Sequence, residues 1–425
     1  MSRAVQVVPS TSAEKAARPR PAFLLLLAAA VATVYGVLLS NTILTLSLKA
    51  TEIDAQGATT VLSVVVGVGS VFSVVGYPVV GRLSDRSLSR LGRRRPYLFA
   101  GAVLIALGAV VTVAAVDVRT LTAGYILTTL GSVSALVACT ALVPDQFPPA
   151  ERGLPSAVLG LGAPVGAVLG LFVAQLVQPD LAAMIFLPAG MAVVAVVALA
   201  LTARDRRLSR DERPDFSLRE FLGTFWVNPV RHPAYGWAWF SRLMIFFGVA
   251  AVNGYQAFYL IMVHHIDPAT VGTSVFVASL LSTGLSLTFA PLLGKFSDMV
   301  GRRKPFVIAS ATVFAIGLGI TAIATTYPMF LLAVAVIGIG QGVYFAVDYA
   351  LVLDVLPDPD NPAKDLGLMN LANSLPTSIV PAVAPALLAL GATASNPQNF
   401  TTLFLAGTAA AVLGALLILP IKGVK

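Results

Sequence analysis

Two charged side chains interrupt long apolar segments of the sequence. Arg242 lies inside the apolar run 235–263, and Asp348 lies inside the run 329–355. An ionised side chain is costly in an apolar medium, so such residues are functional candidates by default. A carboxylate beside a guanidinium can take up and release a proton as its surroundings change. The two residues therefore predict either a pair that handles a proton or an ion pair that only supports the structure.

Polar side chains continue from both charges at helical spacing, and others lie in further apolar runs. Such groups can hydrogen-bond a neutral polar solute and stack it against aromatic rings. The alternative is that they only join neighbouring helices. The candidates for lining a cavity are Tyr35, Asn41, Tyr125, Ser132, Asn253, Gln256, Gln341, Tyr344, Asn370 and Asn373.

A basic segment occurs twice along the chain, at nearly constant separation. Such an internal repeat indicates two homologous halves. The first copy carries four additional residues, 87–90. The matching segments are Gly-Arg-Leu-Ser-Asp (81–85) with Gly-Lys-Phe-Ser-Asp (294–298), Gly-Arg-Arg-Arg-Pro (92–96) with Gly-Arg-Arg-Lys-Pro (301–305), and Ala-Leu-Val-Pro-Asp (141–145) with Ala-Leu-Val-Leu-Asp (350–354).

The carboxylates and guanidinium groups of these segments can pair with one another and with helix termini. Such a cluster can hold two bundles together in one conformation and release them in another. The alternative is a topology signal that only anchors the loops. The candidate gating residues are Gly81, Asp85, Arg86, Gly92, Arg93, Arg94, Asp145, Arg152, Gly294, Asp298, Gly301, Arg302, Arg303 and Asp354.

The segments that must position these residues are apolar throughout. Of 425 residues, 57% are hydrophobic and 11% are charged, whereas soluble domains have about 45–50% and about 25%. This composition excludes an ordinary soluble enzyme. Only helices satisfy their own backbone groups in lipid as single segments of this length. The apolar runs are 22–48, 57–80, 97–116, 120–143, 154–176, 181–203, 235–263, 270–293, 306–325, 329–355, 366–390 and 399–421.

The sequence therefore predicts an all-α integral membrane protein with twelve transmembrane helices in two pseudo-symmetric six-helix bundles. The expected parts are a disordered cytoplasmic tail (1–21), the first bundle (22–203), a cytoplasmic central loop (204–234), the second bundle (235–421) and a short cytoplasmic tail (422–425). In the central loop, Ser-Leu-Arg-Glu (217–220) has the form of a capping box. The apolar spacing that follows predicts a short helix lying on the membrane surface.

The distribution of Lys and Arg fixes the expected orientation. Twenty-five of the 28 lie in the tails and in the loops on one side of the predicted bundle. By the positive-inside rule that side is cytoplasmic, with both termini on it, in a cell membrane. The net charge of +8 then reflects topology, and no nucleic-acid partner is expected. On this topology Arg242 and Asp348 both lie roughly 10–12 Å deep, so they could meet at one level.

The paired segments 81–96 and 294–304 strongly resemble the signature loop of the major facilitator superfamily. The longer first copy resembles the sucrose-transporter and glycoside-pentoside-hexuronide symporter branches. The resemblance extends over 22–421. It implies two six-helix bundles around a central cavity that opens alternately to each side, with the spans that carry Arg242 and Asp348 lining that cavity.

Two details depart from or add to this pattern. The glycoside-pentoside-hexuronide cation symporters carry carboxylates in their second helix, but the run 57–80 contains none, so sodium coupling of that kind is not expected. In addition, Gly-Ala-Pro-Val-Gly (162–166) loosely resembles the Gly-Pro motif of antiporters, although Ala163 replaces its glycine. Close helix packing through small residues is the alternative there.

The resulting prediction is a secondary active transporter, working as a monomer, that moves a small polar solute such as a sugar or glycoside and is driven by protons. The alternative is a proton antiporter that exports a drug-like compound or secondary metabolite. No catalytic set is visible at membrane depth and no nucleotide-binding P-loop occurs, so an enzyme or an ATP-driven pump is not expected. The single cysteine and three histidines form no metal motif, and no cofactor is expected.

Overall fold

The computed structural model describes residues 21–205, 207–208, 227–357, 362–393 and 397–421. Within these ranges the chain is built from helices. The predicted tail 1–20, the predicted surface helix around 217–226 and the last four residues lie outside the described residues.

The first half contains six membrane-spanning segments. They are α1 (Pro21–Ser40), which continues through the π-helical turn η1 (Asn41–Thr45) into α2 (Leu46–Ile53), then α3 (Ala58–Asp85), α4 (Arg95–Ala114), α5 (Val118–Gln146), α6 (Gly153–Leu176) and α7 (Leu181–Thr202). A short 3-10 turn, η2 (Pro149–Glu151), precedes α6.

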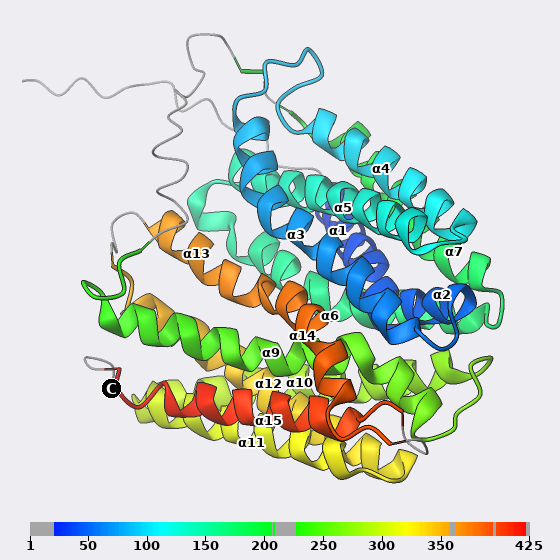
Figure 1. Ribbon diagram of the computed structural model, residues 1–425. Coiled ribbons are helices and arrows are strands. Elements are labelled where there is room, and N and C mark those ends of the chain that lie inside the picture. The colour runs from blue at the N-terminus through cyan, green and yellow to red at the C-terminus, as the bar shows by residue number, and fades with distance from the viewer. Residues whose placement is uncertain (1–20, 206, 209–226, 358–361, 394–396, 422–425) are drawn as a thin grey trace, which may run out of the picture.

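The second half repeats this order with α9 (Pro233–Met262), α10 (Val271–Val300), α11 (Arg303–Ile323), α12 (Tyr327–Asp354), the pair α13 (Pro362–Ser374) and α14 (Pro376–Ala389), and α15 (Phe400–Leu416). Eleven helices of the described chain are long and apolar enough to cross a membrane, counting α1 to α2 as one and α13 to α14 as one. The twelfth, α15, is apolar but shorter. The predicted fold class, an all-helical membrane protein with two six-helix bundles, is confirmed (Figure 1).

Two spans differ from their predicted form. The first extends past residue 48 to Ile53 and widens to π geometry at η1. The span predicted at 366–390 is divided at Leu375, between α13 and α14. Pro376 follows this break and has no backbone N–H to donate, which removes one hydrogen bond of a continuous helix.

Several helices begin at a polar side chain that caps them. The carboxylate of Asp117 accepts hydrogen bonds from the backbone N–H groups of Arg119 and Thr120 at the start of α5. These hydrogen bonds, led by the one from Thr120, lower the pKa of the Asp117 carboxyl. Asp180 caps α7 in the same way. Each cap satisfies backbone donors that have no partner inside the helix.

Within the first half, α1 and α6 approach closely through glycines. A Cβ built on Gly170 would collide with the backbone of Gly36, and one built on Gly166 would collide with Ala32 and Tyr35. Only glycine permits this approach. The segment 162–166, which loosely resembles an antiporter motif, therefore serves at least as a packing surface.

The two halves meet at one end of the molecule, which we call the outer end. There the Ser63 hydroxyl of α3 hydrogen-bonds the Tyr255 hydroxyl of α9 at 2.6 Å, and Phe172 of α6 contacts Phe276 of α10 with ring centroids 5.5 Å apart. The amide of Gln178 donates to the carbonyl oxygen of Pro268. We call the opposite end, which carries the duplicated basic loops, the basic end.

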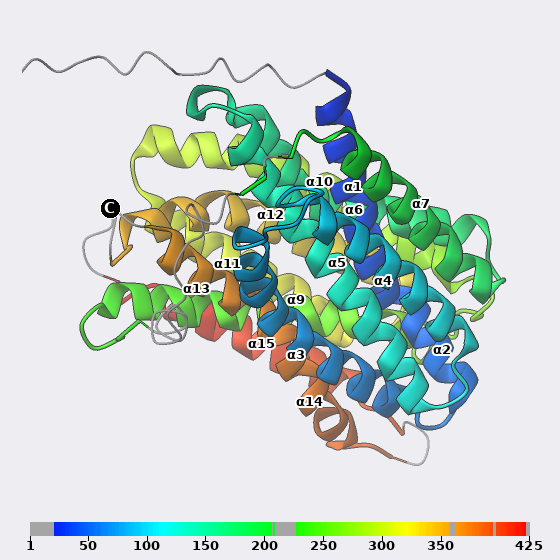
Figure 2. The ribbon, with the colours of Figure 1, turned by 90° about the horizontal axis from the view of Figure 1, so that it is seen from above.

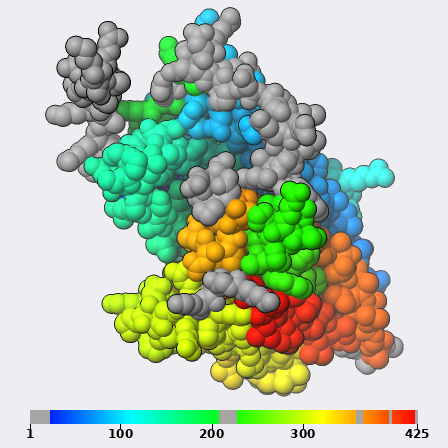
Figure 3. Space-filling model, turned by 90° about the vertical axis from the view of Figure 1, so that its left-hand side faces the viewer, coloured from blue at the N-terminus to red at the C-terminus, as the bar shows by residue number. Residues whose placement is uncertain are grey.

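Towards the basic end the halves diverge. The buried residues of α10 lie between Val271 and Ala278, at its outer end, apart from Ser297. Most of the buried residues of α3 likewise lie in its outer half, between Ala58 and Ser70. Figure 3 looks onto the basic end, where the teal ends of α5 and α6 stand apart from the yellow-green end of α10. The molecule is therefore closed at its outer end and open at its basic end.

Candidate functional site

The two charged residues inside the spans form one ion pair. In α9 and α12, Arg242 and Asp348 meet with Nη2 and Oδ2 2.5 Å apart. The Arg242 Nε also donates to the same carboxylate oxygen at 2.8 Å. Asp348 is fully buried and Arg242 is 6% exposed. The pair joins α9 and α12, which otherwise have little direct contact. Both helices are labelled in Figure 2, which shows the ribbon from above.

The second oxygen of the carboxylate is left without a partner. Asp348 Oδ1 is buried with no hydrogen bond, and the same is true of the Tyr344 hydroxyl one turn away. The nearby Ser241 hydroxyl donates to the carbonyl oxygen of Gly414 in α15. A buried polar atom without a partner costs about 1–3 kcal/mol. The lone pairs of Oδ1 are free, so this oxygen is the one that can take up a proton.

An aromatic layer lies beside the ion pair. Phe246 of α9 and Phe345 of α12 stack with ring centroids 5.3 Å apart and planes 20° apart. Phe345 is 39% exposed, and Tyr349, one turn further along α12, is 51% exposed. On α12, Gly340 packs on α11 and Gly342 packs on α10. Phe345 and Tyr349 lie one turn apart on α12, nearer the basic end than these two contacts, and form an exposed aromatic stripe.

Five of the ten predicted cavity residues are buried within their own halves. The Tyr125 hydroxyl lies 3.3 Å from the Thr42 hydroxyl, and the Asn41 side chain accepts from Thr45. Gln256, Tyr344 and Ser132 are at most 3% exposed. Of the others, Asn370 is exposed, and the half-buried ones are Tyr35, Asn253, Gln341 and Asn373.

At the basic end, the first basic loop is organised around Arg94. Its guanidinium pairs with Asp85 at 2.8 Å and with Asp145 at 3.0 Å, and it donates to the Ser84 hydroxyl. Arg93 pairs with the other oxygen of Asp145 at 2.6 Å. Arg94 is 4% exposed. This cluster joins the basic ends of α3, α4 and α5 within one half.

Asp205 belongs to this cluster, although the sequence analysis missed it. One of its carboxylate oxygens accepts from the backbone N–H groups of Arg94 and Arg95 at 2.6 and 2.7 Å. It therefore caps α4 from a distant part of the chain. Gly92 has a φ of +107°, and a Cβ there would collide with Asp205. The sequence did carry a signal for this role, because Asp205 is an acidic residue among arginines directly after the predicted span 181–203.

The second basic loop is less fully paired. Arg303 pairs with Asp354 at 2.6 Å and donates to the carbonyl oxygen of Ala350. Among the described residues, the side chains of Asp298 and Arg302 take part in no hydrogen bond or ion pair. Gly301 ends α10 in the left-handed conformation, with a φ of +67°. The two copies of the loop therefore share sequence and position but differ in their contacts.

The remaining predicted gating residues take local positions. The Arg152 side chain donates to the carbonyl oxygens of Phe147 and Pro144. Arg86 is half-buried at the end of α3. A Cβ on Gly81 would meet no atom within 4 Å, and one on Gly294 would make an ordinary contact with Ala346.

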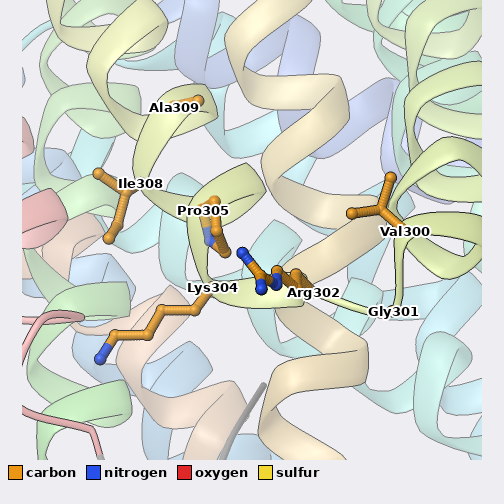
Figure 4. Close-up of a pocket in the computed structure, with 7 residues that line it drawn as sticks. All are labelled: Val300, Gly301, Arg302, Lys304, Pro305, Ile308 and Ala309. Atoms are coloured by element: carbon orange, nitrogen blue, oxygen red, sulfur yellow. The ribbon is translucent and has the colours of Figure 1, made fainter.

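A pocket of about 890 Å³ lies beside the second basic loop. Arg302 and Lys304 line it together with apolar side chains (Figure 4). The Lys304 amine donates hydrogen bonds to the carbonyl oxygens of Leu419 and Ile421, which follow α15. The pocket lies on the flank of the second half, away from Arg242 and Asp348. In the described part of the chain, no three His, Cys, Asp or Glu side chains gather to hold a metal ion.

The curated relatives that match are bacterial proteins. An uncharacterized MFS-type transporter of Bacillus subtilis (strain 168), YfiU, is 31% identical over 110 residues, which are 26% of this chain and 21% of that protein. The multidrug resistance protein MdtL is 34% identical in Shewanella oneidensis over 117 residues, 28% of this chain and 26% of MdtL. MdtL of Citrobacter koseri is 36% identical over 117 residues, with 28% and 27% covered. The chain thus matches only about a quarter of these relatives' length.

Solved structures resemble the whole chain. The nucleoside transporter NupG has a TM-score of 0.71 at 13% identity, covering 95% of this chain and 100% of NupG. The human organic anion transporter MFSD10 has a TM-score of 0.65 at 13% identity, with 93% and 98% covered. A bacterial homologue of the human lysosomal transporter Spinster, inward-facing and unoccupied, has a TM-score of 0.64 at 11% identity, with 94% and 95% covered. At these identities the likeness shows the fold.

The family model named Major Facilitator Superfamily matches residues 21–288 and 264–424, which together span both halves. The match agrees with the duplicated basic loops, the two six-helix bundles and the opening between them. This chain belongs to the Major Facilitator Superfamily of membrane transporters.

Proposed function

We propose that this transporter exports amphipathic organic compounds in exchange for protons. The observation that carries the proposal is the exposed aromatic stripe of α12 beside the ion pair, and we infer that this stripe faces the space between the halves. That stripe presents Phe345 and Tyr349, 39% and 51% exposed, whereas Arg242 and Asp348 are buried. Apolar and aromatic walls with few polar groups suit a drug-like solute.

The polar side chains support the same choice. A sugar needs many hydrogen-bonding partners, because each hydroxyl that loses water without a replacement is costly. Tyr125, Asn41 and Ser63 are already hydrogen-bonded within the protein, and Ser132 and Gln256 are buried. Five of the ten predicted groups are therefore buried and are not offered to a polyhydroxylated solute.

The Arg242–Asp348 pair supplies a mechanism for coupling. Protonation of Asp348 removes its negative charge and frees Arg242, and loss of the proton restores the pair. Two states of the pair can thereby favour two arrangements of α9 and α12. Arg242 also offers a cationic group that an incoming compound can meet once Asp348 is protonated.

The opening at the basic end is the one through which an exporter would bind its substrate from the cytoplasm. The positive-inside rule assigns the basic end to the cytoplasm, so the opening between the halves faces the cytoplasm. In this open state the Asp85–Arg94 pair of the first basic loop lies within one half; the proposed latch would join the halves when the basic end closes. Relatives named multidrug resistance proteins at 33–36% identity over about a quarter of the chain add support.

A second candidate is proton-driven uptake of a sugar or glycoside. Asn370 is exposed, and Gln341 and Asn373 are half-buried. These three residues offer hydrogen-bonding groups from α12 and α13. The extended first basic loop, which resembles the sucrose-transporter and glycoside-pentoside-hexuronide branches, favours this candidate as well.

Purified protein in liposomes with an imposed pH gradient separates the two candidates. Liposomes with an acidic lumen should accumulate the planar dye ethidium against its gradient, and liposomes without protein should not. The second candidate predicts instead that radiolabelled sucrose or a glycoside enters liposomes whose exterior is acidic. Sugar accumulation without any gradient-driven ethidium transport would refute the export proposal.

A further inference from the structure

The structure assigns the pocket beside the second basic loop to an anionic phospholipid, whose phosphate binds Arg302 and whose acyl chain lies along α11. The pocket has a volume of about 890 Å³ and combines cationic with apolar side chains. It lies on the flank of the second half, away from Arg242 and Asp348. The inference therefore does not depend on which compound the transporter moves.

The charges around the pocket favour an anion. Its described lining contains two cationic side chains, Arg302 and Lys304, and no acidic one. The Lys304 amine donates to the carbonyl oxygens of Leu419 and Ile421, but an ammonium group has a third donor and keeps its charge. The Arg302 guanidinium lies beside Pro305 (Figure 4). Among the described residues it has no partner, and guanidinium groups bind phosphate well.

The first basic loop shows why Arg302 is available. In the repeat, Arg93 corresponds to Arg302, and Arg93 pairs with Asp145 at 2.6 Å. Asp354, which corresponds to Asp145, is paired with Arg303. The second copy of the loop therefore leaves free a guanidinium that the first copy uses to join its own helices.

The same comparison identifies a place for a negative group. In the first half, a Cβ on Gly92 would collide with the carboxylate of Asp205. That carboxylate accepts hydrogen bonds from the N–H groups of Arg94 and Arg95. Gly301, which corresponds to Gly92, lines the pocket, and a Cβ on it would meet no described atom within 4 Å. The place that a carboxylate fills in one half is thus open in the other.

An apolar surface leads away from the pocket along α11. Ala309 lines the pocket, and the exposed residues Thr312 and Ile316 follow it at steps of three and four. Residues at this spacing share one face of a helix. Phe296 of α10 packs edge to face on Phe306 of α11, with ring centroids 5.7 Å apart, and holds the two helices together beside the pocket. An acyl chain can lie along this face of α11 while its phosphate occupies the pocket.

The level of the pocket selects a phospholipid. It lies where one membrane-spanning helix ends at Val300 and the next begins at Arg303, which is the level of the lipid headgroups. Basic pockets at this level bind anionic headgroups. Because the described lining offers no carboxylate, the ammonium of a zwitterionic headgroup would find no partner there. Phosphatidylglycerol, which carries one negative charge and no ammonium, fits these groups.

The first test measures lipid affinity by native mass spectrometry of the purified protein in detergent. Arg302→Gln should weaken the binding of phosphatidylglycerol roughly tenfold, as for the loss of a charge-assisted hydrogen bond, and Arg302→Lys should recover part of it. Lys295→Gln is the matched control, because it removes an exposed cation of α10 outside the pocket; its affinity should equal that of wild type. Phosphatidylethanolamine should bind more weakly than phosphatidylglycerol. Equal affinity of wild type and Arg302→Gln would overturn the proposal.

The second test locates the lipid in liposomes of phosphatidylcholine that contain a trace of phosphatidylglycerol with a photoreactive diazirine on its acyl chain. Labelling of residues 305–316, mapped by peptide mass spectrometry, should fall in Arg302→Gln and stay at the wild-type level in Lys295→Gln. Inorganic phosphate in excess over the probe should not reduce it. Equal labelling in Arg302→Gln would show random lipid contact only, and displacement by inorganic phosphate would show a site for a free anion. Either result would overturn the assignment to a phospholipid.

Discussion

Removal of the Arg242 guanidinium should destabilise the second half more than removal of the Asp348 charge does. Arg242→Ala leaves a carboxylate with no exposure, and both of its oxygens then lack a partner, since Oδ1 has none already. Breaking a buried ion pair from one side costs about 3–5 kcal/mol. For a bundle of this size, about 2–4 °C per kcal/mol predicts that the apparent unfolding temperature falls by about 6–20 °C.

A double-mutant cycle isolates the pair. Arg242→Ala, Asp348→Asn and the double variant are compared with wild type by thermal unfolding in detergent, followed by size-exclusion chromatography. The double variant should be more stable than Arg242→Ala alone, because the buried charge is gone. A coupling energy near the top of the range for residues in contact, about 3 kcal/mol, is expected. Additive losses in the double variant would refute the pairing argument.

Three further changes probe the basic end and the packing of the first half. Asp85→Asn should slow transport while expression stays near wild type, because it removes one carboxylate from Arg94; unchanged transport rates would exclude the latch. Asp205→Ala should lower the free energy of unfolding by about 1–2 kcal/mol, as for other lost helix caps, because the N–H groups of Arg94 and Arg95 lose their acceptor. An unchanged unfolding temperature would contradict this. Gly170→Ala should separate α1 from α6 and lower the yield of folded protein. Gly160→Ala is the control, because its new methyl group would meet no atom within 4 Å and should leave the yield unchanged. Equal yields of the two variants would contradict the packing argument.

The spans and their duplication could be predicted because each depends on local sequence. Apolar runs of sufficient length must become helices in lipid, and the repeated basic loops identify matching positions in the two halves. The common depth of Arg242 and Asp348 also followed from counting residues along each helix. The break at Leu375 was missed because a proline in an apolar run is compatible with either a kink or a new helix.

The lining of the opening could not be predicted in the same way. Helical spacing places Asn253, Gln256 and Arg242 on one stripe, but it does not say which neighbour covers that stripe. Gln256 is buried and Asn253 is half-buried. The exposed ring of Phe345 carried no signal, since a phenylalanine in a membrane span usually faces lipid. Asp205 joins α4 across more than a hundred residues, and only tertiary structure brings these segments together.

The central claim is that the Arg242–Asp348 pair couples a proton to substrate movement. Asp348→Asn in liposomes measures this most directly, with ethidium followed both against its gradient under an acidic lumen and down its gradient without one. The account predicts that accumulation against the gradient is lost while downhill movement persists. Full accumulation by Asp348→Asn would show that the pair serves the structure alone.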